Sequence, residues 1–499
     1  MTRGIVATPH HLASEAGAHV LREGGNPVDA AVAANAVLCV VYPHMTSIGG
    51  DLFAMVWPAG AGAPVGLEGA GRSGSNASLE AVRRLGHERM PATGPLTVTV
   101  PGTVAAWGAL IERYGTLGLA PLMEPAAAHA RDGYVVTENL SRALHENFEW
   151  LQEDPAAQRL LPPMKAGMTL RNPELAETLT AIGRSGFIEF YRGEIGKAIV
   201  RTLEARGGLL AATDLGSHRS VWVDPIAFPY RDLTVYEMPP PSQGLVAAGM
   251  LVRLARLGAE RLRPGLGFAR ELVRVRDQVY ALRDRLIGDP GFAEVPVGPF
   301  LDPDFDAGGG GEAIPEGDTI YLCAADEHGN LVSLIQSVAN AFGSGVIAEG
   351  TGVVLQNRGV YFSLDPGHVN RLEPGKKTMH TLIPALAGRG GRPWAAFGNM
   401  GADGQPQFQA QVFVGLADLG LDPQAAVAAP RLRVPAGGGG LWVEADYPEA
   451  LEIARALNAE LKPPRSSLFG HAQAIVVDGP GAWRGGADPR ADGSVAAAE

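Results

Sequence analysis

The sequence predicts a protein of the α+β class, because two helices near the N-terminus and a β-hairpin farther along the chain stand out. Residues 12–23 have helical composition and end at Gly24 and Gly25, since helix C-termini favour glycine. A second helix is predicted to start at Asn26, an N-cap residue followed by Pro27, and to continue over an apolar run. A helix that is apolar on nearly all sides must be buried, so we expect it to lie against a sheet.

The predicted hairpin covers residues 319–338, where two strand-like runs, "TIYLCAAD" and "NLVSLIQSV", are joined by the short turn "EHG". Other segments have strand composition: residues 51–57, 96–100, 233–241, 351–355, 394–398 and 472–477. Helical periodicity is found in residues 243–286 and near residues 406–419. Strands and helices therefore occur along the whole chain.

The composition is that of a globular protein, with 499 residues, 46% hydrophobic and 19% charged residues. The net charge of -12 argues against nucleic acid as a partner, because an acidic surface repels phosphates. The two cysteines, Cys39 and Cys323, exclude a disulfide framework and a cysteine zinc site. We expect two buried thiols, with a single bridge as the alternative.

We expect neither a membrane partner nor a cofactor. The apolar run at residues 28–42 carries Asp29 and Asn35 and is too short to span a bilayer. The N-terminus has no signal-peptide pattern, so a cytoplasmic protein is predicted, with export by another route left open. The glycine pattern at residues 69–74 lacks the context of a dinucleotide site, and the scattered histidines predict no metal site.

Residues 302–318, "DPDFDAGGGGEAIPEGD", form the clearest break in the chain, and we expect them to be exposed and mobile. Thr319 follows directly. A threonine hydroxyl is a poor nucleophile without an adjacent base. If the bond before Thr319 were cut, the new α-amine, with a pKa near ~8, could serve as that base. The alternative is an ordinary threonine at a strand start.

Several long segments occur in a fixed order: "GIVATPHHLASEAGAHVLREGGNPVDAAVAANAVLCVVYPHMTSIGGDLF", "VPGTVAAW", "EPAAAHARDGY", "GDTIYLCAADEHGNLVSLIQS" and "FGSGV". Together they resemble the γ-glutamyltranspeptidase family of N-terminal-nucleophile hydrolases over nearly the whole chain. The resemblance implies a four-layer αββα sandwich that cleaves itself between Asp318 and Thr319. The large subunit, residues 1–318, would hold helical layers and part of the sandwich and end in the segment 302–318. The small subunit, residues 319–499, would stay bound to it, and two such heterodimers could pair.

The resemblance also implies catalytic roles. Thr319 would be the nucleophile, with its α-amine as the general base. Ser337 falls where the family has a hydroxyl that steadies the nucleophile. Gly401 and Ala402 fall on the glycine pair whose backbone N–H groups form the oxyanion hole. Ala402 departs from the family's second glycine, and Ile320 replaces a threonine that often follows the nucleophile.

The positions that match the family's substrate pocket have changed in charge. A γ-glutamyl substrate carries an α-carboxylate and an α-ammonium, and no arginine stands at the usual carboxylate position, near Ser78 and Leu79. The other changes are His380 and Thr381 for two hydroxyls, Tyr361 for the acid at the ammonium, Arg358 for its neutral neighbour, and Ala339 for an asparagine, with Asn340 adjacent.

These changes predict a substrate that has a carboxylate and no α-amino group, because an ammonium beside Arg358 would be unfavourable. Arg358 or Arg72 would hold the carboxylate, although Arg358 in a structural ion pair is the alternative. The segments "LQNRGVYFSLDPGHVN" and "PGKKTMHTLIPAL" resemble the subgroup that includes oxamate amidohydrolase. We therefore predict an amide hydrolase for a small, oxamate-like amide. The rivals are a true γ-glutamyltransferase or glutathione hydrolase, and an unprocessed scaffold without catalysis.

Overall fold

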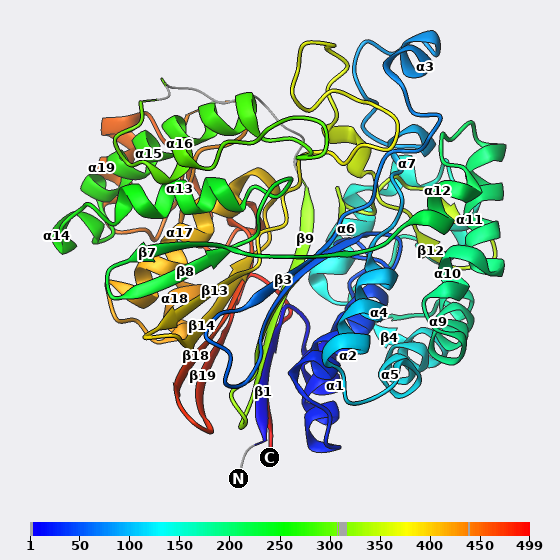
Figure 1. The fold of residues 1–499 in the computed structure, drawn as a ribbon, viewed down its shortest axis with the longest axis horizontal. Coiled ribbons are helices and arrows are strands. Elements are labelled where there is room, and N and C mark those ends of the chain that lie inside the picture. The colour runs from blue at the N-terminus through cyan, green and yellow to red at the C-terminus, as the bar shows by residue number, and fades with distance from the viewer. Residues whose placement is uncertain (1–2, 307, 309–316, 438–439) are drawn as a thin grey trace.

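Two β-sheets stacked face to face form the centre of the molecule, and helices cover both outer faces (Figure 1). The computed structural model describes residues 3–306, 308, 317–437 and 440–499. Within the predicted mobile segment 302–318, residues 307 and 309–316 lie outside the described residues.

The first sheet has seven strands in the order β20-β1-β9-β10-β2-β3-β6, and every neighbouring pair is antiparallel. Its strands are β1 (Gly4–Thr8), β2 (Asp51–Trp57), β3 (Val65–Gly69), β6 (Val221–Val223), β9 (Asp318–Asp326), β10 (Leu331–Ala339) and β20 (Ser494–Ala498). The helices α1 (His11–Arg22), α2 (Pro27–Val41) and α4 (Thr103–Tyr114) pack on its outer face. Helices α5 (Leu119–Asp132) and α9 (Pro173–Ser185) pack outside α2.

The second sheet has six strands in the order β19-β18-β14-β13-β8-β7. They are β7 (Ile226–Tyr230), β8 (Leu233–Glu237), β13 (Ala385–Arg389), β14 (Arg392–Asn399), β18 (Ala472–Gly479) and β19 (Ala482–Ala487). Its outer face carries α13 (Gly244–Leu254), α17 (Gln405–Ala417) and α18 (Pro423–Ala428), while α15 (Leu266–Leu286) packs on α13.

Shorter elements complete the fold. The helices are α3 (Leu79–Arg84), α6 (Glu138–Glu146), α7 (Phe148–Leu151), α8 (Pro155–Leu160), α10 (Ile188–Arg192), α11 (Glu194–Ala205), α12 (Ala212–Ser217), α14 (Ala259–Leu262), α16 (Gly298–Leu301) and α19 (Ala450–Leu457). The strands are β4 (Tyr134–Val135), β5 (Thr169–Leu170), β11 (Ile347–Ala348), β12 (Val353–Val354), β15 (Leu432–Arg433), β16 (Trp442–Glu444) and β17 (Glu460–Lys462). Four 3₁₀ turns are η1 (Pro95–Thr97), η2 (Arg358–Tyr361), η3 (Ala402–Gly404) and η4 (Ser467–Phe469).

Three apolar layers hold the four structural layers together. One lies between the first sheet and its helices, one between the two sheets, and one between the second sheet and its helices. In the middle layer, Trp57 of β2 meets Tyr236 of β8 edge to face, with ring centroids 5.3 Å apart. The predicted αββα sandwich is confirmed.

The predicted buried helix is confirmed as α2. The Asn26 side chain accepts hydrogen bonds from the backbone N–H groups of Val28 and Asp29, and the Asp29 carboxylate accepts one from the Asn26 N–H. All 15 residues of the helix are buried. Reciprocal capping fixes where the helix begins, and its uniform apolarity places it between the sheet and α5.

The predicted strand at residues 96–100 is wrong. Residues 95–97 form the turn η1, and residues 98–100 join no sheet in the described part of the chain. The Val100 N–H donates to the Arg72 carbonyl, but Pro101 has no N–H with which to extend a ladder. Cys39 and Cys323 are both buried and free, as expected. None of the described helices is long and apolar enough to cross a bilayer.

Candidate active site

Thr319 lies near the start of β9, in the first sheet, and is only 1% exposed. Its Oγ1 accepts a hydrogen bond from Nε2 of Gln405 at 3.3 Å. Gln405 is the first residue of α17, which packs on the second sheet, so the threonine lies where the two sheets' layers meet. Sequence reasoning missed Gln405, although its position directly after the predicted oxyanion loop was a usable signal.

Ser337 contacts the peptide bond that precedes Thr319. Its hydroxyl donates to the Asp318 carbonyl oxygen at 2.6 Å and accepts from the Ala339 N–H at 2.8 Å. A β-bulge between Gln336 and Ala339 interrupts the pairing of β10 with β9 at this point. Ala339 has a φ of 79°, and bulges of this kind redirect side chains. The bulge therefore aims the Ser337 hydroxyl at the carbonyl, which it polarises.

The predicted oxyanion loop has an unusual backbone. Gly401 and Ala402 have φ values of 127° and 43°. A Cβ at Gly401 would lie 2.6 Å from the Phe408 ring, so only glycine fits there. Across the described residues, neither the Gly401 N–H nor the Ala402 N–H has a hydrogen-bond acceptor. Both donors are therefore available to a developing oxyanion.

A buried ion pair supports this loop from α15. The Asp403 carboxylate pairs with Arg283, and the Tyr280 hydroxyl donates to the Asp403 carbonyl oxygen. Arg276 is 4.0 Å from the same carboxylate, and both guanidinium groups stack on the Tyr280 ring. Burial alone would lower the pKa of Arg283, but Asp403 and Asp284 raise it. The sequence signal that we missed is the spacing 276, 280 and 283, which places these side chains on one helix face.

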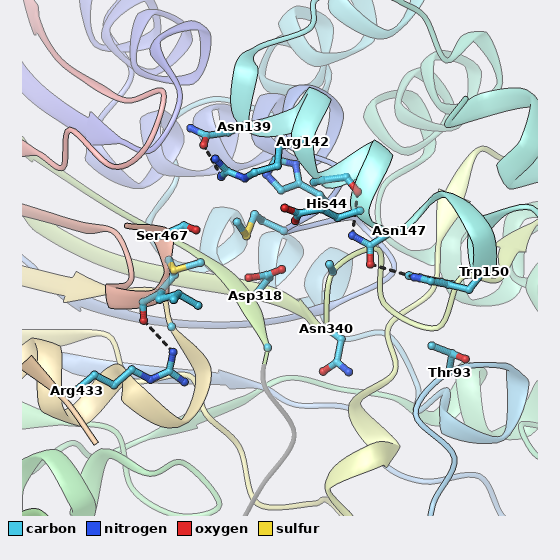
Figure 2. Close-up of a pocket in the computed structure, with 18 of the residues that line it drawn as sticks. His44, Thr93, Asn139, Arg142, Asn147, Trp150, Asp318, Asn340, Arg433 and Ser467 are labelled. Atoms are coloured by element: carbon cyan, nitrogen blue, oxygen red, sulfur yellow. Dashed lines mark hydrogen bonds between the residues drawn. The ribbon is translucent and has the colours of Figure 1, made fainter. Parts of the chain in front are cut away.

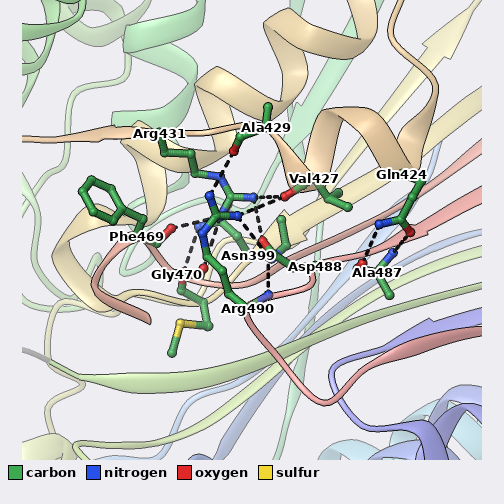
Figure 3. A network of polar contacts seen from close by, with 12 residues as sticks. Asn399, Gln424, Val427, Ala429, Arg431, Phe469, Gly470, Ala487, Asp488 and Arg490 are labelled. Carbon is green, nitrogen blue, oxygen red and sulfur yellow. Dashed lines mark hydrogen bonds and ion pairs between the residues drawn. The ribbon is translucent and has the colours of Figure 1, made fainter. Parts of the chain in front are cut away.

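A second buried network supports the residue before the loop (Figure 3). Arg431 donates to the carbonyl oxygens of Phe469 and Gly470 and pairs with Asp488 at 2.7 Å. The next residue, His471, accepts a hydrogen bond at its carbonyl from the Met400 N–H at 2.9 Å. The chain entering Gly401 is thus held by a second buried network.

Arg358 is fully buried in η2. Its Nη1 donates to Oγ1 of Thr381 at 3.1 Å, and its guanidinium lies 5.1 Å from the centre of the Tyr361 ring. Of the described carboxylates, none lies within ion-pair distance of this side chain, and its Nε and Nη2 have no hydrogen-bond acceptor. Burial lowers the pKa of Arg358. The described part of the chain therefore contains no structural ion pair of Arg358, which was the alternative.

Gly317 separates Tyr361 from the oxyanion loop. A Cβ at Gly317 would lie 2.9 Å from the Tyr361 hydroxyl oxygen, 2.7 Å from the Ala339 carbonyl oxygen and 3.2 Å from the Ala402 Cβ. Only glycine fits there without displacing a neighbour. The residue two positions before Thr319 therefore occupies the space between Tyr361 and the loop.

His380 lies beside Arg358 and bonds to Asp51, with 3.0 Å between Nε2 and Oδ2. Burial, followed by the charge of Arg358, lowers the pKa of His380 to about 4, so the neutral ring donates to the carboxylate. The other Asp51 oxygen accepts from the Gly71 and Gly102 N–H groups and from Gln356. Asp51 and Gln356 were not predicted, and their buried hydrogen bonds hold this cluster together.

The two remaining predicted residues, Asn340 and Arg72, lie in different parts of the structure. Asn340 follows the bulge, and its N–H donates to Oδ1 of Asn357 at 2.9 Å. Arg72 is far from enclosed: its side chain is 49% exposed, 3.5 Å from Asp289, and donates to the Gly375 carbonyl. The structure brings Arg358, Tyr361, His380 and Thr381 together and leaves Arg72 at a separate surface position.

A cavity of about 480 Å³ opens beside the bond that precedes Thr319 (Figure 2). It contains the predicted residues Asp318, Asn340 and Gly401 in its lining, with Gly317. Sequence reasoning missed its other polar residues, which are His44, Thr93, Asn139, Arg142, Glu146, Asn147, Arg433 and Ser467. Among the residues described, no cluster of three or more His, Cys, Asp or Glu side chains is arranged to hold a metal ion.

We expect the free energy of unfolding to fall as the pH is lowered from about 6.5 towards 4. Burial lowers the pKa to about 3 for His10 and His44 and to about 4 for His218, His380 and His471. Between these values and about 6.5, the unfolded chain binds more protons than the native chain, so acid favours unfolding. Urea unfolding at pH 7.5, 6 and 5 measures the change.

In that experiment, His380→Asn removes one buried histidine, so the free energy of unfolding should fall less between pH 6.5 and 5 than in the wild type. His145→Asn, at an exposed position of α6, is the matched control and should keep the wild-type profile. A free energy of unfolding that stays constant from pH 7.5 to pH 5 would contradict the prediction.

Residues 13–498 match the family described as Gamma-glutamyltranspeptidase. The chain belongs to the gamma-glutamyltranspeptidase family. It is 37% identical to the glutathione hydrolase-like YwrD proenzyme of Bacillus subtilis (strain 168), over 99% of this chain and 98% of that protein. It is 35% identical to the oxamate amidohydrolase proenzyme of Klebsiella pneumoniae, with the same coverage of each chain.

A solved member with a similar structure is the cephalosporin acylase from Bacillus halodurans. The two structures have a TM-score of 0.91 and 36% sequence identity, over 99% of this chain and 96% of the acylase. The predicted family, its N-terminal-nucleophile hydrolase fold and the hydrolase class are confirmed. These gamma-glutamyltranspeptidase relatives carry different substrate names, so membership leaves the substrate of this chain to its own pocket.

Proposed function

We propose that the chain is a self-processing amide hydrolase with Thr319 as its nucleophile. The observation that carries this proposal is the arrangement at residues 318 and 319: a buried threonine hydroxyl follows a carbonyl that already accepts a 2.6 Å hydrogen bond from Ser337. Such a hydrogen bond stabilises negative charge on the carbonyl oxygen when a nucleophile adds. The proenzyme names of two relatives agree with processing.

In the processing step, Oγ1 of Thr319 attacks the Asp318 carbonyl carbon. A C–O bond forms, the Asp318–Thr319 C–N bond breaks, and the hydroxyl proton moves to the departing nitrogen. Water then hydrolyses the ester, which leaves a carboxylate on Asp318 and a free α-amine on Thr319. Ser337 stabilises the oxyanion of this step.

In turnover, the α-amine of Thr319 takes the hydroxyl proton and Oγ1 attacks the substrate amide. The N–H groups of Gly401 and Ala402 stabilise the oxyanion, and the proton is delivered to the leaving nitrogen as the C–N bond breaks. Water then releases the acid from the ester. Gln405, which already bonds Oγ1, orients the nucleophile.

The two fragments would remain associated because they share both sheets. In the first sheet, β1, β2, β3 and β6 precede residue 319, whereas β10, β20 and nearly all of β9 follow the cut. In the second sheet, β7 and β8 come from the large fragment and the other four strands from the small one. Separation would expose strand edges and three apolar layers.

We propose that the substrate is a small amide that carries a carboxylate and no α-ammonium, with oxamate as its simplest member. A buried arginine without a carboxylate partner favours an anionic ligand, and Arg358 has no such partner among the residues that the structure describes. Departure of Gly317 would open the space in front of Tyr361 and give a substrate carboxylate access to this cluster. Arg358 and Tyr361 offer no negative charge to an α-ammonium.

We expect the processed protein to release ammonia from oxamate and to act poorly on γ-glutamyl-p-nitroanilide. Arg358→Met should lower kcat/KM for oxamate by about 100-fold, since a hydrogen bond to a charged group is worth about 1.5–3 kcal/mol. Arg72→Met tests the second candidate and should have little effect. Strong turnover of γ-glutamyl-p-nitroanilide with a dipeptide acceptor would favour a true γ-glutamyltransferase instead.

A further inference from the structure

The pocket beside Thr319 is larger than oxamate requires. Its volume of about 480 Å³ falls in the range of about 300–1,000 Å³ that is usual for ligand sites. Oxamate has only six non-hydrogen atoms and would fill a small part of this space. Trp150, Trp442 and Leu468 add apolar walls. An acyl group longer than that of oxamate would fill this space better.

The charge of the pocket would change on processing. Arg142 and Arg433 contribute two positive charges to the lining, and Glu146 and Asp318 contribute two negative charges. Burial lowers the pKa of His44 to about 3, so its ring is neutral. When Asp318 leaves with the large fragment's new C-terminus, the lining loses one negative charge. That loss makes the pocket more favourable for an anion.

Two side chains are placed to bind that anion. Arg142 of α6 is an exposed residue of the lining, and its Nη2 donates to Oδ1 of Asn139 at 2.7 Å, which orients its guanidinium. His44 is 2% exposed, and within the described chain neither of its ring nitrogens has a hydrogen-bond partner. A buried polar group without a partner is costly, so a ligand that bonded His44 would gain free energy.

Asp318 lies in the middle of this pocket, with Arg142 and His44 on one side and Arg433 on another (Figure 2). Its main-chain carbonyl is the group that Thr319 would attack during processing, and its side-chain carboxylate carbon is three bonds from that carbonyl carbon. Processing and turnover form their esters on the same Oγ1. The two acyl groups therefore extend from the same point.

Resting on the proposed amide hydrolysis at Thr319, we infer that the Asp318 side chain holds, in the uncleaved chain, the place of the carboxylate of a longer substrate. Arg142 and His44 bind that carboxylate in the processed enzyme, while Arg358 remains the partner of the shorter oxamate. The carboxylate of succinamate has the same three-bond spacing from its amide carbonyl. The preferred substrate is then a monoamide of a four-carbon dicarboxylic acid. The reaction breaks the amide C–N bond and adds water, so that succinamate gives succinate and ammonia.

The test compares ammonia release by the processed wild-type protein from oxamate, malonamate, succinamate, glutaramate and the uncharged butyramide. We expect kcat/KM to be highest for succinamate, by about 10-fold or more over both oxamate and butyramide. This chain-length profile needs no variant. A maximum at oxamate would overturn the inference and leave the proposed function standing.

Variants of Arg142 then test whether this side chain binds the substrate's carboxylate. Arg142→Gln should lower the ratio of succinamate to butyramide kcat/KM by about 10–100-fold, and Arg142→Lys should restore part of that ratio. Arg131→Gln is the matched control, because Arg131 lies on α5, outside the lining, 3.7 Å from Glu124. A ratio that Arg142→Gln leaves unchanged would overturn the role of Arg142.

A denaturing gel, run beside the activity assay, distinguishes failure of the inference from failure of the proposed function. A chain cut before Thr319 that hydrolyses oxamate but not succinamate refutes the inference alone. A cut chain that hydrolyses none of the amides refutes the inference and the proposed substrate class, while processing stands. A chain that is never cut and never active refutes the inference together with the proposed function.

Discussion

Thr319→Ala is expected to leave the purified chain as one full-length band on a denaturing gel and to abolish amide hydrolysis. The variant lacks the hydroxyl that forms both proposed esters, and Ser337 cannot replace it because its hydroxyl already bonds the carbonyl under attack. Removing a nucleophile from another hydrolase lowers kcat by about 10⁶-fold. Gel analysis after prolonged incubation, with N-terminal sequencing of the smaller wild-type band, measures processing, and ammonia release measures activity.

Two controls accompany that variant. Thr319→Ser keeps a hydroxyl and should be processed, at a reduced rate. Thr180→Ala removes a hydroxyl that donates to the Ala176 carbonyl within α9, away from the site, and should be processed like the wild type. Cleavage of Thr319→Ala at the same bond would contradict the proposed nucleophile. One intact wild-type band would favour the scaffold that cannot catalyse.

Arg283→Met is expected to lower the free energy of unfolding by about 3–5 kcal/mol, because it leaves the buried Asp403 carboxylate without its close partner. Arg276, 4.0 Å away, compensates only in part. Asp403 directly follows Ala402, so the loop that presents the two N–H donors should also shift. We therefore expect turnover by the processed fraction to fall by about 10²–10³, the usual effect of losing one oxyanion donor.

Urea unfolding and single-turnover kinetics measure the two effects of Arg283→Met. Arg270→Met, on the same helix α15 at an exposed position, is the matched control and should change stability by less than about 0.5 kcal/mol. Combining Arg283→Met with Asp403→Asn removes both charges and should recover part of the lost stability. An unchanged Arg283→Met variant would show that the ion pair does not hold the loop.

Local sequence patterns predicted the elements whose structure depends on local interactions. The helix from Asn26 and the hairpin around residue 328 carry their capping, turn and apolar signals within a few residues. The strand β1 was missed because five residues, Gly4–Thr8, give little periodicity, although β1 pairs with β9 and β20 in the sheet. Residues 96–100 alternate like a strand, yet no neighbouring strand accepts them.

The site was predictable only where a motif contains it. Ser337, Gly401 and Ala402 lie close to Thr319 in the sequence or in a recognisable loop. In the structure, Ser337 bonds the Asp318 carbonyl, and Ala402 lies beside Gly317. Arg142 comes from a helix some 180 residues earlier, and no periodicity links α6 to β9. Arg72 and Arg358 are equally basic in sequence, but only folding shows one at the surface and the other fully buried.

The sharing of both sheets between residues before and after 318 has a thermodynamic consequence. In the intact chain, folding is unimolecular, so the midpoint of thermal unfolding is independent of protein concentration. A cut at residue 318 turns the same equilibrium into a bimolecular one, in which the midpoint rises with concentration. Separated fragments must reassociate before either sheet can be completed. Before processing, the native state can re-form after unfolding. After processing, it would persist mainly because it unfolds slowly.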